Sequence, residues 1–95
     1  MKIKNAEFHN NRIILYKNKK DIEIFVDNIK DIIYYRPSFW GFISAYISWN
    51  TPGILQIHLI DKVENKKAYI LRIKYEDVKK LPKNIKEKIG PTLIP

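Results

Sequence analysis

Apolar and polar residues alternate along much of this chain, and this period of two predicts β-strands. In residues 12–17, Ile13 and Leu15 share one face. In residues 67–75, Tyr69 and Leu71 face one side while Arg72 faces the other, as in an antiparallel strand with one covered face. The strands predicted in this way cover residues 3–8, 12–17, 22–26, 29–35, 54–60 and 67–75.

Polar residues, glycine and proline separate these strands and predict the turns. Residues 17–21 suit a hairpin loop of about four or five residues, and residues 61–66 suit a second hairpin loop. Asp27-Asn28 marks another turn, and Asn50-Thr51-Pro52-Gly53 suits a type II turn. Residues 54–60 are apolar on most of both sides, which predicts a central strand.

The period changes near the C-terminus. An apolar stripe with spacings of 3, 4 and 4 predicts an amphipathic helix, and it consists of Val78, Leu81, Ile85 and Ile89. Pro82 interrupts the stripe, so two arrangements stay open. Either one helix kinks there, or a short turn at residues 76–81 precedes a second helix with Pro82 near its first position. Gly90-Pro91 then ends the helix.

Residues 37–60 contain no charged side chain, although the chain has 18 basic and 10 acidic residues. The front part of this window, residues 39–49, holds both tryptophans. As a helix it would align its aromatic rings in one stripe, and as a strand it would alternate them with β-branched residues. The aromatic and β-branched content favours a seventh strand.

Three interpretations of residues 39–49 stay open. The rings fill the core, or they form a surface for self-association or a protein partner, or they enter a membrane interface beside lysines. The segment does not span a bilayer, because eleven residues fall short of the roughly 20 that a spanning helix needs.

Composition narrows the class of protein. The 95 residues predict one domain, residues 1–95, with a single core. The absence of cysteine excludes disulfides and thiolate metal sites and favours a cytoplasmic location, and the N-terminus shows no secretory signal. The net charge of +8 favours anionic partners, although a solvated lysine-rich surface is the simpler explanation. Fifteen of the 18 basic residues are lysine, whereas a protein specialised in binding phosphate groups would use more arginine.

Catalytic motifs are missing from the sequence. It contains no nucleophile elbow, zinc-protease motif or phosphate-binding loop, so we expect no enzyme, no cofactor and no metal site. The two histidines are His9 and His58. His58 lies in an apolar run, where we expect a hydrogen-bonded interior or edge residue rather than a general base.

The order of these elements resembles bacterial pleckstrin-homology-like (PH-like) domains. The segment Arg12-Ile13-Ile14-Leu15-Tyr16 followed by residues 22–32 is similar to a strand pair and the step that follows it in that family, and residues 54–81 are similar to its last hairpin and helix entry. The resemblance implies a mainly β fold: a seven-stranded antiparallel barrel or orthogonal sandwich with a C-terminal α-helix covering one corner. Many members bind phosphoinositides through basic residues of the first hairpin loop, to which Lys17, Lys19 and Lys20 correspond here. The loop is short and lacks the lysine and arginine spacing of the lipid binders.

The sequence therefore predicts a non-catalytic interaction module. Its partner would be another protein, a second copy of the chain, or an anionic membrane surface to which the protein binds peripherally. The alternative is a small basic β-barrel that binds nucleic acid through phosphate contacts and stacked rings. The predicted binding residues are Lys17, Lys19, Lys20, Arg36, Phe39, Trp40, Phe42, Tyr46 and Trp49.

Overall fold

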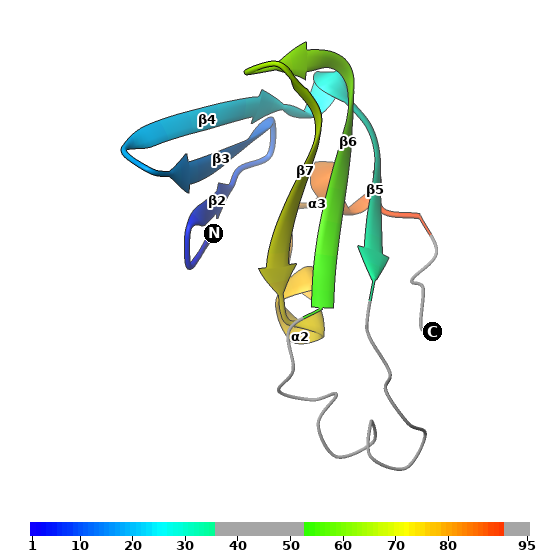
Figure 1. Cartoon of the computed structure of the whole chain (residues 1–95). Coiled ribbons are helices and arrows are strands. Elements are labelled where there is room, and N and C mark those ends of the chain that lie inside the picture. Colours follow the sequence, from blue (N-terminus) through cyan, green and yellow to red (C-terminus); the bar gives the residue numbers. More distant parts are fainter. Residues whose placement is uncertain (36–52, 91–95) are drawn as a thin grey trace.

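The protein is mainly β, with two antiparallel sheets and short C-terminal helices (Figure 1), in a computed structural model that describes residues 1–35 and 53–90. The four-stranded sheet contains, in order, β1 (Lys2–Ile3), β2 (Ala6–Phe8), β3 (Arg12–Lys17) and β4 (Lys20–Phe25). The 3-10 helix η1 (Val26–Asn28) leads to the three-stranded sheet of β5 (Ile29–Tyr35), β6 (Gly53–Val63) and β7 (Lys66–Ile73). The strands of the two sheets run at a steep angle to each other.

One hydrophobic core lies between the sheets. On β3 the alternation buries Ile13 and Leu15, and on the central strand β6 it buries Leu55, Ile57 and Leu59. The expected central position of residues 54–60 is confirmed, although the strand is longer and continues to Val63. The other face of β6 is only half-buried, so its apolar residues do not all belong to the core.

Both hairpin turns are shorter than predicted. Lys17 pairs with Lys20 and Val63 pairs with Lys66, so each turn has only two central residues. These residues have positive φ angles, of 40° and 65° at Asn18 and Lys19 and of 51° and 64° at Glu64 and Asn65. Two positive φ angles characterise the type I′ turn, whose twist matches that of the paired strands. The polar residues beyond each turn therefore lie in strands, where they are exposed.

The C-terminal stripe forms two short helices rather than one. They are α2 (Tyr75–Lys79) and α3 (Lys83–Lys86), and Pro82 is the N-cap residue of α3. This confirms the second of the two predicted arrangements, because proline cannot donate the hydrogen bond that would continue α2. The stripe is buried as expected at Val78, Leu81 and Ile85, and Ile89 packs against the core.

The two sheets do not close into a barrel within the described ranges, which corrects that part of the prediction. No ladder joins β1 or β4 to β5 or β7. One edge of the three-stranded sheet is instead covered by the C-terminal segment, where the Ile32 N–H donates to the Lys88 carbonyl at 2.8 Å and the Gly90 N–H donates to the Ile32 carbonyl at 3.0 Å.

Within the described residues there are seven strands, one more than the six predicted there. Residues 3–8 were expected to form one strand, and the first eight residues instead form β1 and β2, separated by a turn at which Lys4 has a φ of 48°. The predicted strand at 39–49 lies outside the described residues. Six predicted binding residues also lie outside the described residues and stay predictions: Arg36, Phe39, Trp40, Phe42, Tyr46 and Trp49.

Candidate functional site

Two hairpins from different sheets meet at one end of the molecule. We call residues 17–20 and 62–67 the hairpin tips. The Lys20 Nζ donates to Glu64 Oε2 at 2.7 Å, across 44 positions of the chain. In sequence the tips hold six lysines and one glutamate, a net charge of +5.

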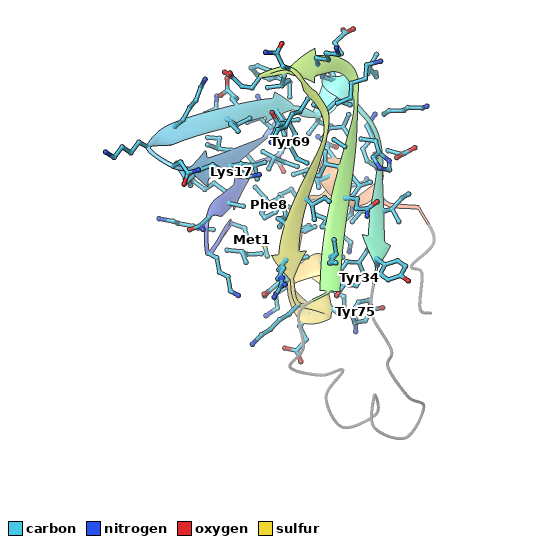
Figure 2. All side chains as sticks on the ribbon, viewed as in Figure 1. Met1, Phe8, Lys17, Tyr34, Tyr69 and Tyr75 are labelled. Atoms are coloured by element: carbon cyan, nitrogen blue, oxygen red, sulfur yellow. The ribbon has the colours of Figure 1, made fainter. Side chains whose placement is uncertain are left out.

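Tyr69 forms the inner support of the tips. Its side chain is 2% exposed, and its hydroxyl donates to the Val63 carbonyl at 2.5 Å. The Nζ atoms of Lys17 and Lys66 lie 5.3 and 6.0 Å from its ring centroid, within the range of cation–π attraction. Figure 2 labels Lys17 and Tyr69. Burial raises the pKa of Tyr69, and the negative charge of Glu64 raises it further. The ring therefore stays neutral and holds two lysines of different sheets close together.

The predicted cations of the first hairpin have three different surroundings. Lys17 lies over the Tyr69 ring, Lys20 is paired with Glu64, and Lys19 is exposed at the turn. Lys66 was not among the predicted binding residues, and the β6–β7 hairpin brings it to the same place. No local pattern identifies it, because its proximity to Lys17 depends on how the two sheets pack.

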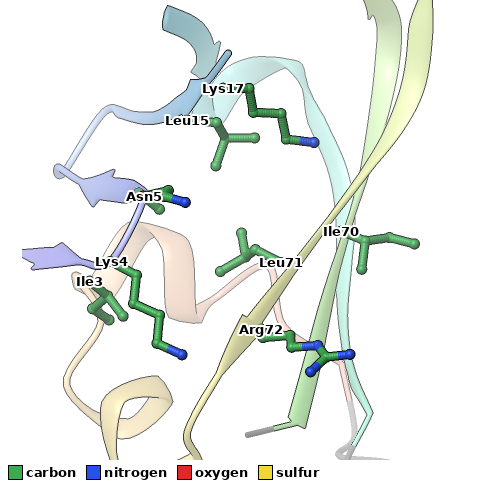
Figure 3. A pocket seen from close by; sticks show the side chains of 9 residues that line it. Ile3, Lys4, Asn5, Leu15, Lys17, Ile70, Leu71 and Arg72 are labelled. Atoms are coloured by element: carbon green, nitrogen blue, oxygen red, sulfur yellow. The ribbon is translucent and has the colours of Figure 1, made fainter. Parts of the chain in front are cut away.

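A groove lies beside this end, between the four-stranded sheet and β7 (Figure 3). We call it the β7 groove, and its volume is about 270 Å³. Lys4, Lys17 and Arg72 line it, with Ile3, Leu15 and Leu71 among the apolar side chains, and no carboxylate is among its lining residues within the described ranges. In those ranges neither Lys4 nor Arg72 forms an ion pair. The groove therefore combines an apolar lining with unneutralised positive charge. Of its lining residues, Lys17 alone was among the predicted binding residues.

A hydrogen-bonded cluster occupies the outer side of the four-stranded sheet. The carboxylate of Glu7 accepts a bond from the Tyr16 hydroxyl and lies 3.0 Å from the His9 Nε2. The Tyr16 bond lowers the pKa of Glu7, and the same bond raises the pKa of Tyr16, because each holds the partner in the bonded protonation state. A structural role accounts for the cluster, because its bond joins two strands. Among the described residues, no nucleophile that a base could activate lies beside it.

Replacing Tyr16 with phenylalanine should raise the pKa of Glu7 toward its ordinary value. Because the folded carboxyl has the lower pKa, its bond stabilises the fold above the unfolded pKa and is lost as pH falls through the folded pKa. The Tyr16→Phe protein should therefore lose less stability between neutral and acid pH. Carboxyl NMR titration and denaturant unfolding at both pH values measure this, and Tyr35→Phe is the control. An unchanged Glu7 titration would contradict the assignment.

His58 is half-buried on β6, and its Nδ1 lies 2.5 Å from Asp31 Oδ1 on the paired strand β5. This agrees with the expected hydrogen-bonded histidine. Among the side chains that the structure describes, no three of the types His, Cys, Asp and Glu gather in a way that could hold a metal ion.

Comparison with protein-family models, with curated proteins and with solved structures finds no match to this chain. Within residues 1–35 and 53–90, no helix has both the length and the apolar character needed to cross a membrane.

Proposed function

We propose that this protein is a PH-like, non-catalytic interaction module that binds an anionic membrane surface through the hairpin tips. The order of its elements supports the fold assignment, because a four-stranded antiparallel sheet is followed by a three-stranded sheet and C-terminal helices. A fold alone does not identify the ligand. The class of ligand is inferred from the charge and geometry of the tips.

The observation that carries the proposal is the gathering of lysines from both sheets at the tips. Lys17 and Lys66 share the Tyr69 ring, Lys19 projects from one turn, and Lys67 is exposed beside the other. Lysine is a flexible point charge that does not form the two parallel bonds of an arginine fork. Such a cluster suits a surface that presents many negative charges, where each lysine contributes about 1 kcal/mol.

The same geometry favours a membrane over nucleic acid. Single-stranded nucleic acid binds strongly where bases stack on exposed aromatic rings. Among the described residues, the aromatic ring that supports the tips is Tyr69, which is 2% exposed and therefore offers no face to a base.

Sedimentation with vesicles tests the proposal. A triple substitution of the tips, Lys19→Gly with Lys66→Gln and Lys67→Gln, should weaken binding to phosphatidylserine-rich vesicles by about 100-fold, from about 1 kcal/mol per lysine. Glycine is chosen at Lys19 because φ there is 65°, a conformation that glycine adopts without strain. High salt should weaken wild-type binding, since the attraction is screened.

The matched control removes three lysines from the helices, as Lys79→Gln, Lys83→Gln and Lys86→Gln. The helix α2 lies at the end of the three-stranded sheet opposite to the β6–β7 turn (Figure 1). Both triple variants have the same net charge, so equal losses would contradict a specific role for the tips. A gel shift with single- and double-stranded nucleic acid that disappears in the tip variant would instead support the nucleic-acid alternative.

A further inference from the structure

The two edges of the three-stranded sheet differ in whether other backbone segments cover them. Backbone bonds from Ile32 to Lys88 and Gly90 cover the β5 edge. The opposite edge belongs to β7, an eight-residue strand that pairs only with β6 among the described strands. An uncovered edge presents N–H and C=O groups that can pair with another strand.

The space beside this edge is hollow. The β7 groove reaches residues 70–72 of β7, and an adjoining cavity of about 180 Å³ reaches residues 72–74. The two cavities share Ile3, Lys4 and Arg72 in their linings. They therefore form a continuous path along five residues, 70–74, as a bound extended segment would require.

The charge of the path selects an anionic occupant. Lys4 and Lys17 come from the four-stranded sheet and Arg72 comes from β7 itself (Figure 3). Lys74 continues the positive charge, and Asp77, at the far end, is the one carboxylate among the described lining residues. Carboxylates of a partner would neutralise cations that form no ion pair within the described part of the chain.

The lining also selects against a small anion. Leu71 points from β7 into the groove and faces the side of Leu15 and Ile3 (Figure 3). A free phosphate would meet the cations but would leave this apolar surface and the backbone groups of β7 in water. An extended peptide meets all three requirements, because its backbone pairs with the edge while its side chains alternate between the two sides.

We propose that β7 accepts an extended acidic segment of a protein partner as an additional strand. Its carboxylates contact Lys4, Lys17 and Arg72, and its aliphatic side chains pack on Ile3, Leu15 and Leu71. This binding is separate from the proposed membrane function, because it depends on the β7 edge, Lys4 and Arg72 and shares only Lys17 with the hairpin tips.

Three fluorescently labelled peptides, long enough to run beside residues 70–74, test the proposal by anisotropy. The first alternates glutamate with valine. The second replaces glutamate with lysine, and the third keeps the side chains of the first but carries a methyl group on each backbone nitrogen. We expect the first to bind at least about tenfold more tightly than either control, since charge and backbone donors are both required.

Protein variants locate the site. Arg72→Glu and Lys4→Asn should each weaken binding of the first peptide, and Arg72→Glu should do so by about tenfold or more because it places like charges together. Asparagine tolerates the positive φ of 48° at position 4. The control Lys83→Glu on α3 should change binding less than about twofold, because Lys83 lines neither cavity and an exposed charge is screened. Amide hydrogen exchange in β7 should slow when the peptide is bound.

Several results would overturn the proposal. Binding of the methylated peptide as tight as that of the first would show a simple anion site, as would binding of inorganic phosphate with the same dependence on Arg72. Equal losses in Arg72→Glu and Lys83→Glu would show attraction to net charge. Unchanged exchange in β7, or no binding of the first peptide, would exclude strand addition. The Lys19, Lys66 and Lys67 triple variant should still bind the peptide, so failure here is distinguishable from failure of the membrane proposal.

Discussion

Replacing Gly53 with alanine should lower the free energy of unfolding by about 3 kcal/mol, the upper part of the range for overpacking a core. A Cβ at this position would lie 2.5 Å from the Tyr34 Oη and 2.6 Å from its Cζ. Tyr34 is fully buried, its hydroxyl donates to the Ile73 carbonyl at 3.2 Å, and its ring stacks on Tyr75 at 6.0 Å. The ring therefore cannot move aside without breaking these contacts.

Urea unfolding of Gly53→Ala measures the effect. The control is Gly90→Ala, where a Cβ would meet nothing within 4 Å, and we expect a change there below about 0.5 kcal/mol. A double-mutant cycle with Tyr34→Leu identifies the cause, because the cost of Gly53→Ala should fall once the ring is removed. A cost that stays the same in the Tyr34→Leu background would contradict the steric explanation.

Replacing Ile57 with alanine should cost about 2–5 kcal/mol, the range for truncating a buried isoleucine. Ile57 lies on the central strand β6 and is 0% exposed. The loss combines the transfer of its methyl groups with the cavity that remains. Against the roughly 5–15 kcal/mol that stabilises a typical domain, this is a large fraction.

Ile60 provides the matched control, because it has the same side chain on the same strand but is 52% exposed. Ile60→Ala should change stability by less than about 1 kcal/mol. Thermal and denaturant unfolding of the two variants compare the faces of β6 directly. Equal losses at both positions would mean that the outer face of β6 is covered by a contact that the described residues do not show.

The strands were predictable because their signal is local. The alternation around Ile13 and Leu15 lies within one segment and does not depend on tertiary packing. The same is true of the turn signal at Asp27-Asn28. The hairpin loops were predicted too long for a definite reason. Lys20 is polar and was assigned to a loop, but in β4 it lies at the exposed start of the strand. Polarity alone does not distinguish a turn from the solvent face of a strand.

The candidate site was predictable only in part. Lys17, Lys19 and Lys20 are neighbours in sequence, so their cluster was visible. The pairing of Lys20 with Glu64 and the approach of Lys17 to Tyr69 require two sheets to meet across more than 40 positions. The same holds for the β7 groove, where Lys4 and Arg72 come from opposite ends of the chain. No spacing rule in one sequence encodes such proximity.

The bonds from Ile32 to Lys88 and Gly90 also affect the order of events during synthesis. A nascent chain leaves the ribosome with its N-terminus first. β5, β6 and β7 therefore leave the ribosome before the residues that cover the β5 edge. Until Gly90 has emerged and docked, the β5 edge can pair with a strand of a neighbouring chain.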